Sequence, residues 1–193
     1  MTVFSRYNIT VIQAKNFREV DGTMAENLKT RSSIIETPTG RIKIVSDGSF
    51  IKELRITSDM PVRPDLPDEL LIRAERELAE YFSGTRRCFD VPVYPDVTSF
   101  EKSVYDVLCG IPYGDTVSYG ALSEILCGSK RMARAVGQAL GKNPILIMIP
   151  CHRVIGAKGE GGFSAGLERK RYLLTLEKTY LNGITAHQGP YHF

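Results

Sequence analysis

The pattern of apolar and polar positions first becomes regular near residue 32. Residues 1–31 show no firm period, and we expect an irregular N-terminal extension there. Short runs rich in β-branched residues follow at 32–37, 41–45 and 50–56, and turn-forming residues (Pro38-Thr39-Gly40 and Asp47-Gly48) separate them. Short runs of this kind, divided by tight turns, predict a small antiparallel meander.

A helical period replaces the strand pattern after a proline-rich loop at 61–67. Leu70, Leu71, Ala74, Leu78 and Phe82 recur on one face, so a helix is expected over 68–82. A three-stranded sheet with one helix beside it makes a small α+β domain. The segment 85–97, with two prolines, is expected to be an extended linker.

The second half of the chain has a helical pattern. Thr98 and Glu101 have the spacing of a capping box, which predicts a helix from there to residue 108 or 109. Ser118 is expected to cap a short helix over 119–126, and a third helix is expected over 131–140. Two short helices joined by a tight glycine-containing turn have the form of a helix-turn-helix, although an ordinary helical hairpin would give the same pattern.

These elements predict an α+β protein of two domains. Residues 1–95 would form the N-terminal domain, a small antiparallel sheet with a helix. Residues 96–193 would form a helical, winged-helix-like domain that carries the helix-turn-helix.

The clearest chemical signal lies at the end of a short apolar run, 145–149. Pro150 follows this run and precedes Cys151, His152 and Arg153. We expect a buried segment that leads into a short helical turn, with the cysteine near the positive end of the peptide dipoles, where a thiolate is favoured. Cys88 and Cys109, by contrast, fit the commoner role of a cysteine as a small buried residue.

Five glycines make 156–166 a flexible, close-packing loop, and an amphipathic helix is expected over 167–177. Glu177 would then lie near the C-terminal end of that helix, where a carboxylate opposes the helix dipole. It is either a surface residue of no consequence or a residue that a polar partner holds. The segment 178–193 has no readable role, and His187 and His192 are expected to be solvated.

Composition and charge narrow the class of protein. The 193 residues carry a net charge of +3, but the part from residue 100 onward has 11 Lys and Arg against 7 Asp and Glu, which is a mild nucleic-acid signal. The first residues lack the apolar core of a signal peptide and no run is long enough to cross a membrane, so we expect a soluble intracellular protein. The four cysteines are widely spaced, so neither a disulfide framework nor a zinc ribbon is indicated.

The third predicted helix is unusual for a reader of base edges. Ala133, Ala135, Gly137 and Ala139 leave it with few long polar side chains, and Arg134 is its one long projecting group. We expect such a helix to approach DNA closely and with weak sequence preference.

Taken in order, Tyr119, Arg134, Asn143, the block Pro150-Cys151-His152-Arg153-Val154, the glycine-rich loop and Glu177 resemble the O6-alkylguanine-DNA alkyltransferases. The resemblance is strong over 99–178 and only architectural over 32–95. It implies irreversible transfer of an alkyl group from O6-alkylguanine, and from O4-alkylthymine, in double-stranded DNA to Cys151, by a monomer that uses no cofactor and acts once. It also implies a cytoplasmic protein, or a nuclear one in a eukaryote.

The resemblance assigns roles to individual residues. Cys151 would pass its proton to His152 through a water, Glu177 would orient that histidine, Asn143 would hold the turn, and Tyr119 would help rotate the nucleotide and donate a hydrogen bond to the departing guanine. The helix would lie in the minor groove, with Arg134 filling the space of the flipped nucleotide. The DNA-binding set implied is Tyr119, Lys130, Arg131, Ala133, Arg134, Ala135 and Gly137. The base pocket implied is Met148, Val154, Phe163, Ser164 and Ala165.

Two of those pocket residues, Phe163 and Ala165, depart from the residues common in the family. Some relatives bind a structural zinc in the N-terminal domain, but with no histidine and only Cys88 there, we expect no metal site in this chain. Arg153 is expected to hold structure or phosphate.

Three other functions fit parts of the pattern. A lesion-binding relative would lack the cysteine, a Cys-His hydrolase would turn over, and a redox-sensing helix-turn-helix regulator would oxidise Cys151 reversibly and bind a specific sequence.

Overall fold

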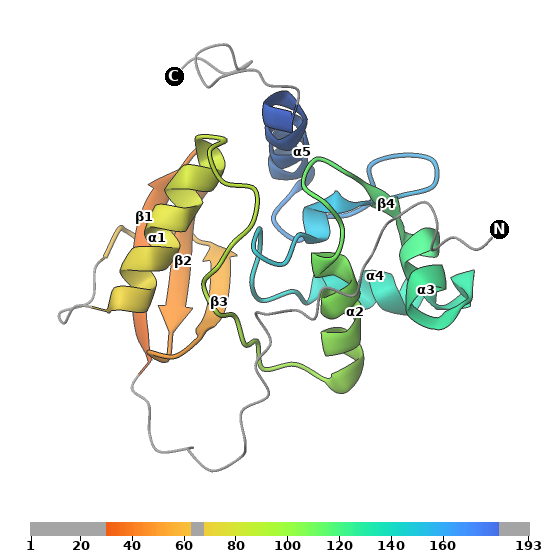
Figure 1. The fold of residues 1–193 in the computed structure, drawn as a ribbon, viewed down its shortest axis with the longest axis horizontal. Helices are drawn as coiled ribbons and strands as arrows, with labels where there is room; N and C mark the ends of the chain where they lie inside the picture. The colour runs from red at the N-terminus through yellow and green to blue at the C-terminus, as the bar shows by residue number, and fades with distance from the viewer. Residues whose placement is uncertain (1–29, 63–67, 182–193) are drawn as a thin grey trace. The chain divides into compact units, whose positions relative to one another are not determined.

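In the computed structural model, the β-branched runs of the N-terminal half form a three-stranded antiparallel sheet (Figure 1). The structure describes residues 30–62 and 68–181. The strands pair in the order β1-β2-β3, and they are β1 (Arg31–Thr37), β2 (Gly40–Ser46) and β3 (Ile51–Ile56). Thr37 pairs with Gly40, whose φ of 103° suits glycine at this tight turn, so the expected meander is confirmed.

Helix α1 (Glu69–Phe82) packs against β1 and β2. Asp68 caps it, since its side chain accepts hydrogen bonds from the backbone N–H groups of Leu70 and Leu71. The buried side chains of the helix and the sheet form one core, and they are Ile34, Ile42, Ile44, Ile51, Leu54, Leu71, Ala74, Leu78 and Tyr81. The helix expected over 68–82 therefore has the right bounds, with its first residue acting as the cap.

Two distant segments cover the outer edge of β3. Ile51 bonds through its backbone to Pro92 and Tyr94, and Leu54 bonds to Pro144 and Leu146. Covering an edge strand in this way satisfies backbone groups that would otherwise be free to pair with another chain. The compact unit built on the sheet thus contains residues 30–62, 68–96 and 144–148, whereas the sequence placed 144–148 with the C-terminal half.

The run 145–149 is buried as expected, but it is not a strand. Only Ile145 makes a bridge to β3, and the residues after it form turns. Ile147 has a φ of 70°, the left-handed conformation that a β-branched residue rarely adopts. The sequence gives no signal for this, because nothing in the apolar run marks a reversal.

The second unit, residues 97–143 and 149–181, is mainly helical (Figure 1). Its helices are α2 (Ser99–Cys109), α3 (Tyr119–Cys127), α4 (Ala133–Gly141) and α5 (Leu167–Leu181), with 3-10 turns η2 (Lys130–Met132) and η3 (Cys151–Arg153). The strands β4 (Val117–Ser118) and β5 (Val154–Ile155) are two residues long and pair in parallel. Together with the sheet unit, this confirms the α+β class.

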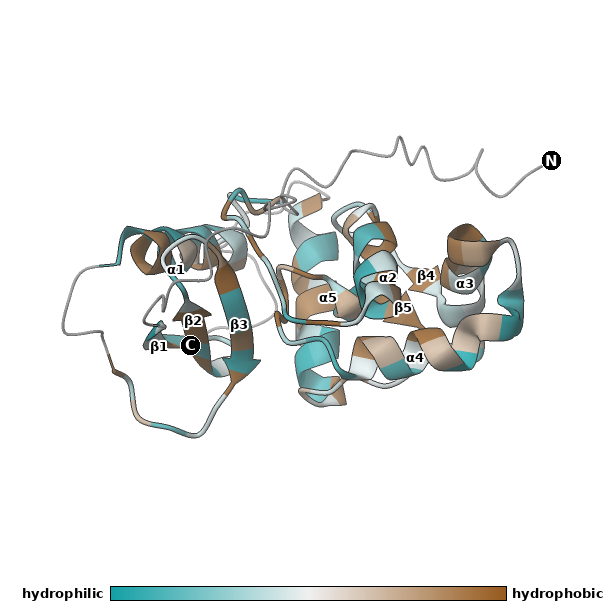
Figure 2. Ribbon diagram, turned by 90° about the horizontal axis from the view of Figure 1, so that it is seen from below, coloured by the Kyte–Doolittle hydropathy of each residue, from teal (hydrophilic) through white to brown (hydrophobic). Residues whose placement is uncertain are grey.

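The caps predicted for α2 and α3 are present. Thr98 and Glu101 form a complete capping box, and the side chain of Ser118 accepts a hydrogen bond from the backbone of Ala121. Helix α3 ends at Gly128, in the left-handed conformation with φ 70°. In Figure 2, α3 is mostly hydrophobic and α5 carries broad hydrophilic bands.

Helices α3 and α4 contact each other and both contact α2. Tyr105 of α2 fixes the end of α4, because its buried hydroxyl donates a hydrogen bond of 2.8 Å to the carbonyl of Ala139. The third helix does not run continuously from residue 131. The turn η2 precedes it, since Ser129 caps that turn by accepting a hydrogen bond from Arg131.

Some expectations from the sequence differ from the structure or concern residues that it does not describe. Helix α5 continues to Leu181, four residues beyond the predicted end. Cys88 and Cys109 are exposed and not buried; Cys109 is the last residue of α2, where the buried face of the helix ends. The expected N-terminal extension lies outside the described residues, apart from residues 30 and 31, as do His187 and His192. None of the helices in the described ranges is both long and apolar enough to span a membrane.

Candidate active site

Cys151 lies at the start of the turn η3 and is 3% exposed. Its backbone N–H donates to the carbonyl of Ile149 at 2.8 Å. Asn143, which follows the end of α4, donates from Nδ2 both to that carbonyl, at 2.9 Å, and to Cys151 Sγ, at 3.1 Å. One amide therefore ties the reactive sulfur to the backbone that precedes it, which matches the turn-holding position expected for Asn143.

The surroundings of Cys151 act on its ionisation in opposing directions. Burial raises the pKa of the thiol to about 11, although the hydrogen bond from Asn143 and the positive charge of Lys170 lower it in part. Desolvation dominates because a single 3-10 turn has few aligned peptide dipoles to offset it. Burial and the hydrogen bond from Asn143 thus act on the thiol in opposite directions.

His152 and Glu177 form a completely buried pair. The distance from His152 Nε2 to Glu177 Oε1 is 2.8 Å, and both side chains are 0% exposed. Burial alone would raise the pKa of Glu177, but the hydrogen bond and charge of His152 and the charge of Arg153 lower this pKa to about 2. Burial also lowers the pKa of His152, so the ring is neutral beside an ionised carboxylate.

This pairing fixes the tautomer of His152. An ionised carboxylate only accepts hydrogen bonds, so Nε2 must carry the proton and Nδ1 must carry the lone pair. Nδ1 is buried and has no hydrogen-bond partner among the residues that the structure describes. Nδ1 is therefore the ring atom that can accept a proton.

Arg153 completes the surroundings of Glu177. Its Nε lies 3.0 Å from Glu177 Oε2, its Nη2 lies 3.0 Å from Oε1, and its Nη1 donates to the carbonyl of Ile111 at 2.7 Å. The backbone N–H of Gly114 also donates to Oε2, at 2.8 Å. Arg153 is 7% exposed, and these contacts join the turn η3 to α5 and to the carbonyl of Ile111.

A small pocket of about 110 Å³ opens onto Cys151. Its lining comes from α3, α4, the turn η3 and the glycine-rich loop, and consists of Tyr119, Gly137, Leu140, Gly141, Cys151, Gly162, Phe163 and Ser164. Phe163 and Ser164 were expected here. Met148, Val154 and Ala165 are outside this lining; Val154 is fully buried in β5, and Met148 belongs to the sheet unit.

Tyr119, the first residue of α3, stands between two glycines. A Cβ atom on Gly137 would lie 3.6 Å from its ring, and one on Gly161 would lie 2.7 Å from it. The Tyr119 hydroxyl donates to the carbonyl of Gly162 at 3.4 Å. The glycines therefore make room for an aromatic ring in the lining of the cysteine pocket.

The basic residues expected to bind DNA precede or belong to α4. Arg131 and Arg134 are exposed, while Ala133, Ala135 and Gly137 are partly exposed. Because Gly137 also lines the cysteine pocket, this helix reaches from the basic surface to the reactive sulfur.

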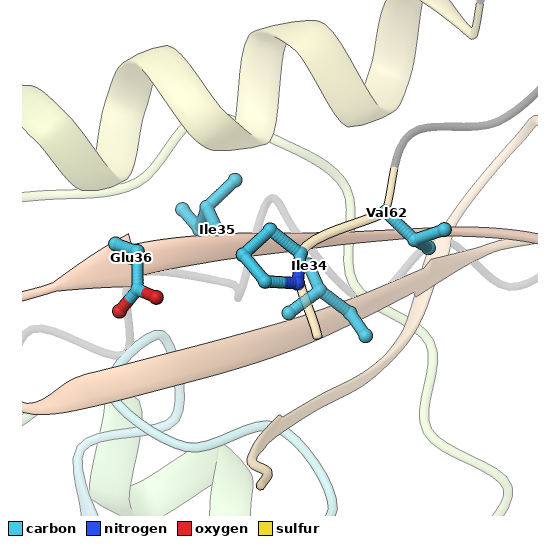
Figure 3. Close-up of a pocket in the computed structure, with 5 residues that line it drawn as sticks. Ile34, Ile35, Glu36 and Val62 are labelled. Atoms are coloured by element: carbon cyan, nitrogen blue, oxygen red, sulfur yellow. The ribbon is translucent and has the colours of Figure 1, made fainter. Parts of the chain in front are cut away.

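A larger cavity, of about 480 Å³, lies beside β1 in the sheet unit (Figure 3). Ile34, Ile35, Glu36, Pro61 and Val62 line it, and none of these is a nucleophile with a paired base. Size alone would favour this cavity as the functional site, but the cysteine lies at the smaller pocket.

Comparison with known proteins agrees with this geometry. Residues 99–179 match the family model of the 6-O-methylguanine DNA methyltransferase DNA-binding domain. A methylated-DNA–protein-cysteine methyltransferase of Methanosarcina acetivorans is 40% identical over 152 residues, which cover 75% of this chain and 96% of the relative. The chain belongs to the methylated-DNA–protein-cysteine methyltransferase family. A family member from Mycobacterium tuberculosis is 41% identical over 150 residues, covering 75% of this chain and 90% of that one.

The solved structures extend the likeness to the whole fold. The crystal structure of Mycobacterium tuberculosis OGT in complex with DNA has a TM-score of 0.68 and 39% identity, and covers 78% of this chain and 93% of that chain. The likeness therefore includes the sheet unit, for which the sequence offered only an architectural resemblance.

The sequence alone did not identify Lys170 as a buried residue of this methyltransferase. Lys170 is 0% exposed and donates to three backbone carbonyls. Its position in the helical period could have indicated burial, because residues 170, 173 and 177 recur on one face of α5 and all three are buried.

Proposed function

We propose that this protein repairs DNA as a methylated-DNA–[protein]-cysteine S-methyltransferase, moving the alkyl group of O6-alkylguanine irreversibly to Cys151 Sγ. The observation that carries the proposal is a buried cysteine that lines a pocket and receives a hydrogen bond from Asn143. The residue that follows it, His152, is paired with Glu177. Family membership supports the same reaction.

In the proposed reaction, the thiol of Cys151 loses its proton to Nδ1 of His152 through a water. The sulfur then attacks the alkyl carbon, so the Sγ–C bond forms as the O6–C bond breaks and the bonding pair stays on the guanine. Glu177 stabilises the resulting imidazolium by its negative charge, and Arg153 holds Glu177 in position. Burial raises the pKa of Cys151, so the proton transfer to His152 is the step that produces the nucleophilic thiolate.

The lesion must leave the duplex to reach this sulfur. Cys151 is nearly inaccessible at the end of a pocket, and extruding a nucleotide costs roughly a few kcal/mol. The small residues of α4 would lie in the minor groove, and Arg134 would occupy the gap left in the stack. Tyr119, which lines the pocket, would assist rotation and donate a hydrogen bond to the departing base.

The same pocket would accept O6-alkylguanine and O4-alkylthymine, since both carry the alkyl group on an exocyclic oxygen. At about 110 Å³ the pocket is smaller than usual ligand pockets, which run from about 300 Å³ upward, so the glycine-rich wall must move to admit a base. Backbone groups of Cys151 and Val154 and the Ser164 region would recognise the base edges, with Phe163 as the apolar wall.

The decisive experiment uses duplex DNA with radiolabelled O6-methylguanine. We expect one methyl group per chain, on the Cys151 peptide by mass spectrometry, and no transfer by Cys151→Ala, which should still bind the DNA. The exposed Cys88, Cys109 and Cys127 are internal controls. Multiple turnover would instead indicate a hydrolase, and label on an exposed cysteine would reject the assignment.

Replacing Arg134 tests its role in extrusion. Arg134→Ala should slow transfer from duplex DNA at least about tenfold, because the gap in the stack stays unfilled. Transfer from free O6-methylguanine should keep its rate, since no stack is broken there. Arg171→Ala, another exposed arginine, serves as the control. A duplex rate equal to that of the unmodified protein would refute the gap-filling role of Arg134.

A further inference from the structure

Pro150 is the centre of a three-residue turn that ends at the reactive cysteine. The backbone N–H of Cys151 donates to the carbonyl of Ile149 at 2.8 Å, and Pro150 between them has φ −83° and ψ 59°. A hydrogen bond to the second residue back, with these angles at the centre, defines an inverse γ-turn, the common form of this turn. The backbone that leads directly into Cys151 is therefore not strained.

Ile147 is the centre of a second γ-turn, and this one is strained. The backbone N–H of Met148 donates to the carbonyl of Leu146 at 2.8 Å, and Ile147 has a φ of 70°. A γ-turn with a positive φ at its centre is the rare form, and a β-branched side chain makes this conformation costlier still. Among the non-glycine residues that the structure describes, only Ile147 has a positive φ. The strain thus lies in the segment that precedes the nucleophile.

Hydrogen bonds on both sides keep the strained turn closed. Before the turn, Leu54 of β3 exchanges two backbone hydrogen bonds, each of 2.9 Å, with the segment 144–146. After the turn, the side chain of Asn143 donates to the carbonyl of Ile149 at 2.9 Å. The central side chain is itself only 3% exposed. A strained residue persists where its surroundings fix the chain on either side in this way.

The residue type at the centre of the strained turn has a consequence for Cys151. Glycine would adopt this φ at no steric cost, but it would also adopt many other backbone angles. A side chain excludes most of those alternatives, so the direction in which the chain leaves the turn is restricted. Only residues 148–150 separate Ile147 from Cys151, and a different direction at Ile147 would therefore displace the sulfur relative to His152.

We propose that Ile147 is a positioning residue of the alkyl-transfer site, because its strained γ-turn restricts the direction from which the chain reaches Cys151. The inference rests on the proposed function and deepens it, since it assigns a residue that sets the place of the nucleophile. An isoleucine that only filled the core would contribute to stability and would not affect the reaction in any other way.

The test compares alanine with glycine at position 147 of the full-length protein. Both variants remove nearly all of the buried side chain, so the difference between them isolates the backbone. Ile147→Gly should have a urea midpoint about 0.5 M above that of Ile147→Ala, because glycine accepts a positive φ without strain. Ile145 is the matched control, since it is 0% exposed in the same run and has no positive φ. There, alanine should be the more stable variant.

Methyl transfer should follow the opposite order. With saturating duplex DNA that contains O6-methylguanine, Ile147→Gly should transfer at least about tenfold more slowly than Ile147→Ala, because the nucleophile is less well placed. The half-saturating DNA concentration should be the same for both variants. Ile145→Ala and Ile145→Gly should share one transfer rate. A more stable protein that reacts more slowly is a result that a purely structural role of Ile147 does not produce.

Amide hydrogen exchange at Cys151, measured by NMR without DNA, reports the turn independently of the reaction. Exchange should be at least about fivefold faster in Ile147→Gly than in Ile147→Ala, because the turn opens locally more often. A purely structural role predicts slower exchange in the more stable glycine variant. The Ile145 pair should show no such local acceleration.

Three results would each overturn the proposal: a lower urea midpoint for Ile147→Gly than for Ile147→Ala, transfer at an equal or higher rate, or Cys151 exchange that is not faster. If either variant does not fold, Ile147→Leu is compared with the unmodified protein. It keeps the volume without the β-branch, so faster exchange with slower transfer supports the proposal, and unchanged values overturn it. If the unmodified protein transfers no methyl group to Cys151, the proposed function is rejected, and the exchange at Cys151 decides the role of Ile147 in the turn.

Discussion

Glu177 is the residue on which the local structure of the site depends most. Its two oxygens accept hydrogen bonds from His152, from Arg153 and from the backbone of Gly114. These donors come from the turn η3 and from the segment between α2 and β4, so the carboxylate joins both to α5. The sequence placed Glu177 where a carboxylate opposes the helix dipole, and the structure shows that polar partners from elsewhere in the chain hold it.

Replacing Glu177 by glutamine should damage both stability and reaction. The variant leaves Arg153 buried without a counter-charge, which should lower the free energy of unfolding by about 3 kcal/mol. The alkyl-transfer rate should fall about 100-fold, since the imidazolium loses its stabilising charge. Urea denaturation and single-turnover kinetics measure the two effects.

The control for Glu177→Gln is Glu160→Gln. Glu160 is also paired with an arginine, but on the surface, so its replacement should leave stability within error. A folded Glu177→Gln protein with normal transfer kinetics would show that His152 needs no carboxylate partner.

At the scale of elements, the glycine-rich loop and α3 are fitted to each other. Gly161 has a φ of 70°, and a Cβ atom there would lie 2.7 Å from the Tyr119 ring and 3.0 Å from the backbone N of Gly156. Neither the backbone nor the ring can give way freely at those distances. The loop therefore approaches α3 closely because of glycine at this one position.

Gly161→Ala should displace the loop or the Tyr119 ring and lower the alkyl-transfer rate at least about tenfold. The cost has two sources, a strained positive φ and a steric overlap. Gly162→Ala, one residue later, is the control, because a Cβ there would meet nothing within 4 Å. Equal rates for the two variants in single-turnover assays would show that the fit around Tyr119 has no bearing on the reaction.

At the scale of the whole molecule, burial of the His152–Glu177 pair makes stability depend on pH. Both groups have lowered pKa values in the folded protein, from an ordinary 6.5 for His152 and from 4.5 to about 2 for Glu177. The unfolded chain therefore binds more protons than the folded one at low pH. The stabilising contribution is complete above pH 6.5 and is lost as pH falls.

Urea midpoints should accordingly decrease from pH 7 to pH 5, as His152 protonates in the unfolded chain, and more steeply from pH 4.5 towards pH 2. Glu177→Gln should flatten the steeper part of this profile. A midpoint that stays constant between pH 7 and pH 3 would contradict the buried, ionised state of the pair.

The sequence alone was sufficient to predict the features that depend on residues close together in the chain. The start of α2 followed from Thr98 and Glu101, and the start of α3 followed from Ser118, because caps act through hydrogen bonds within a few residues. The meander followed from short runs rich in β-branched residues and from the turn-forming residues between them. The reactive cysteine was recognisable because proline, histidine and arginine adjoin it.

Tertiary structure decided what depends on distant neighbours. The segment 144–148 joins the sheet unit because the edge of β3 offers free backbone groups to it, and nothing within the segment encodes that edge. The raised pKa of Cys151 and the enclosure of Lys170 follow from burial, which is set by the elements packed around them. Desolvation depends on the surrounding elements, so the direction of a pKa shift can be predicted only from the folded structure.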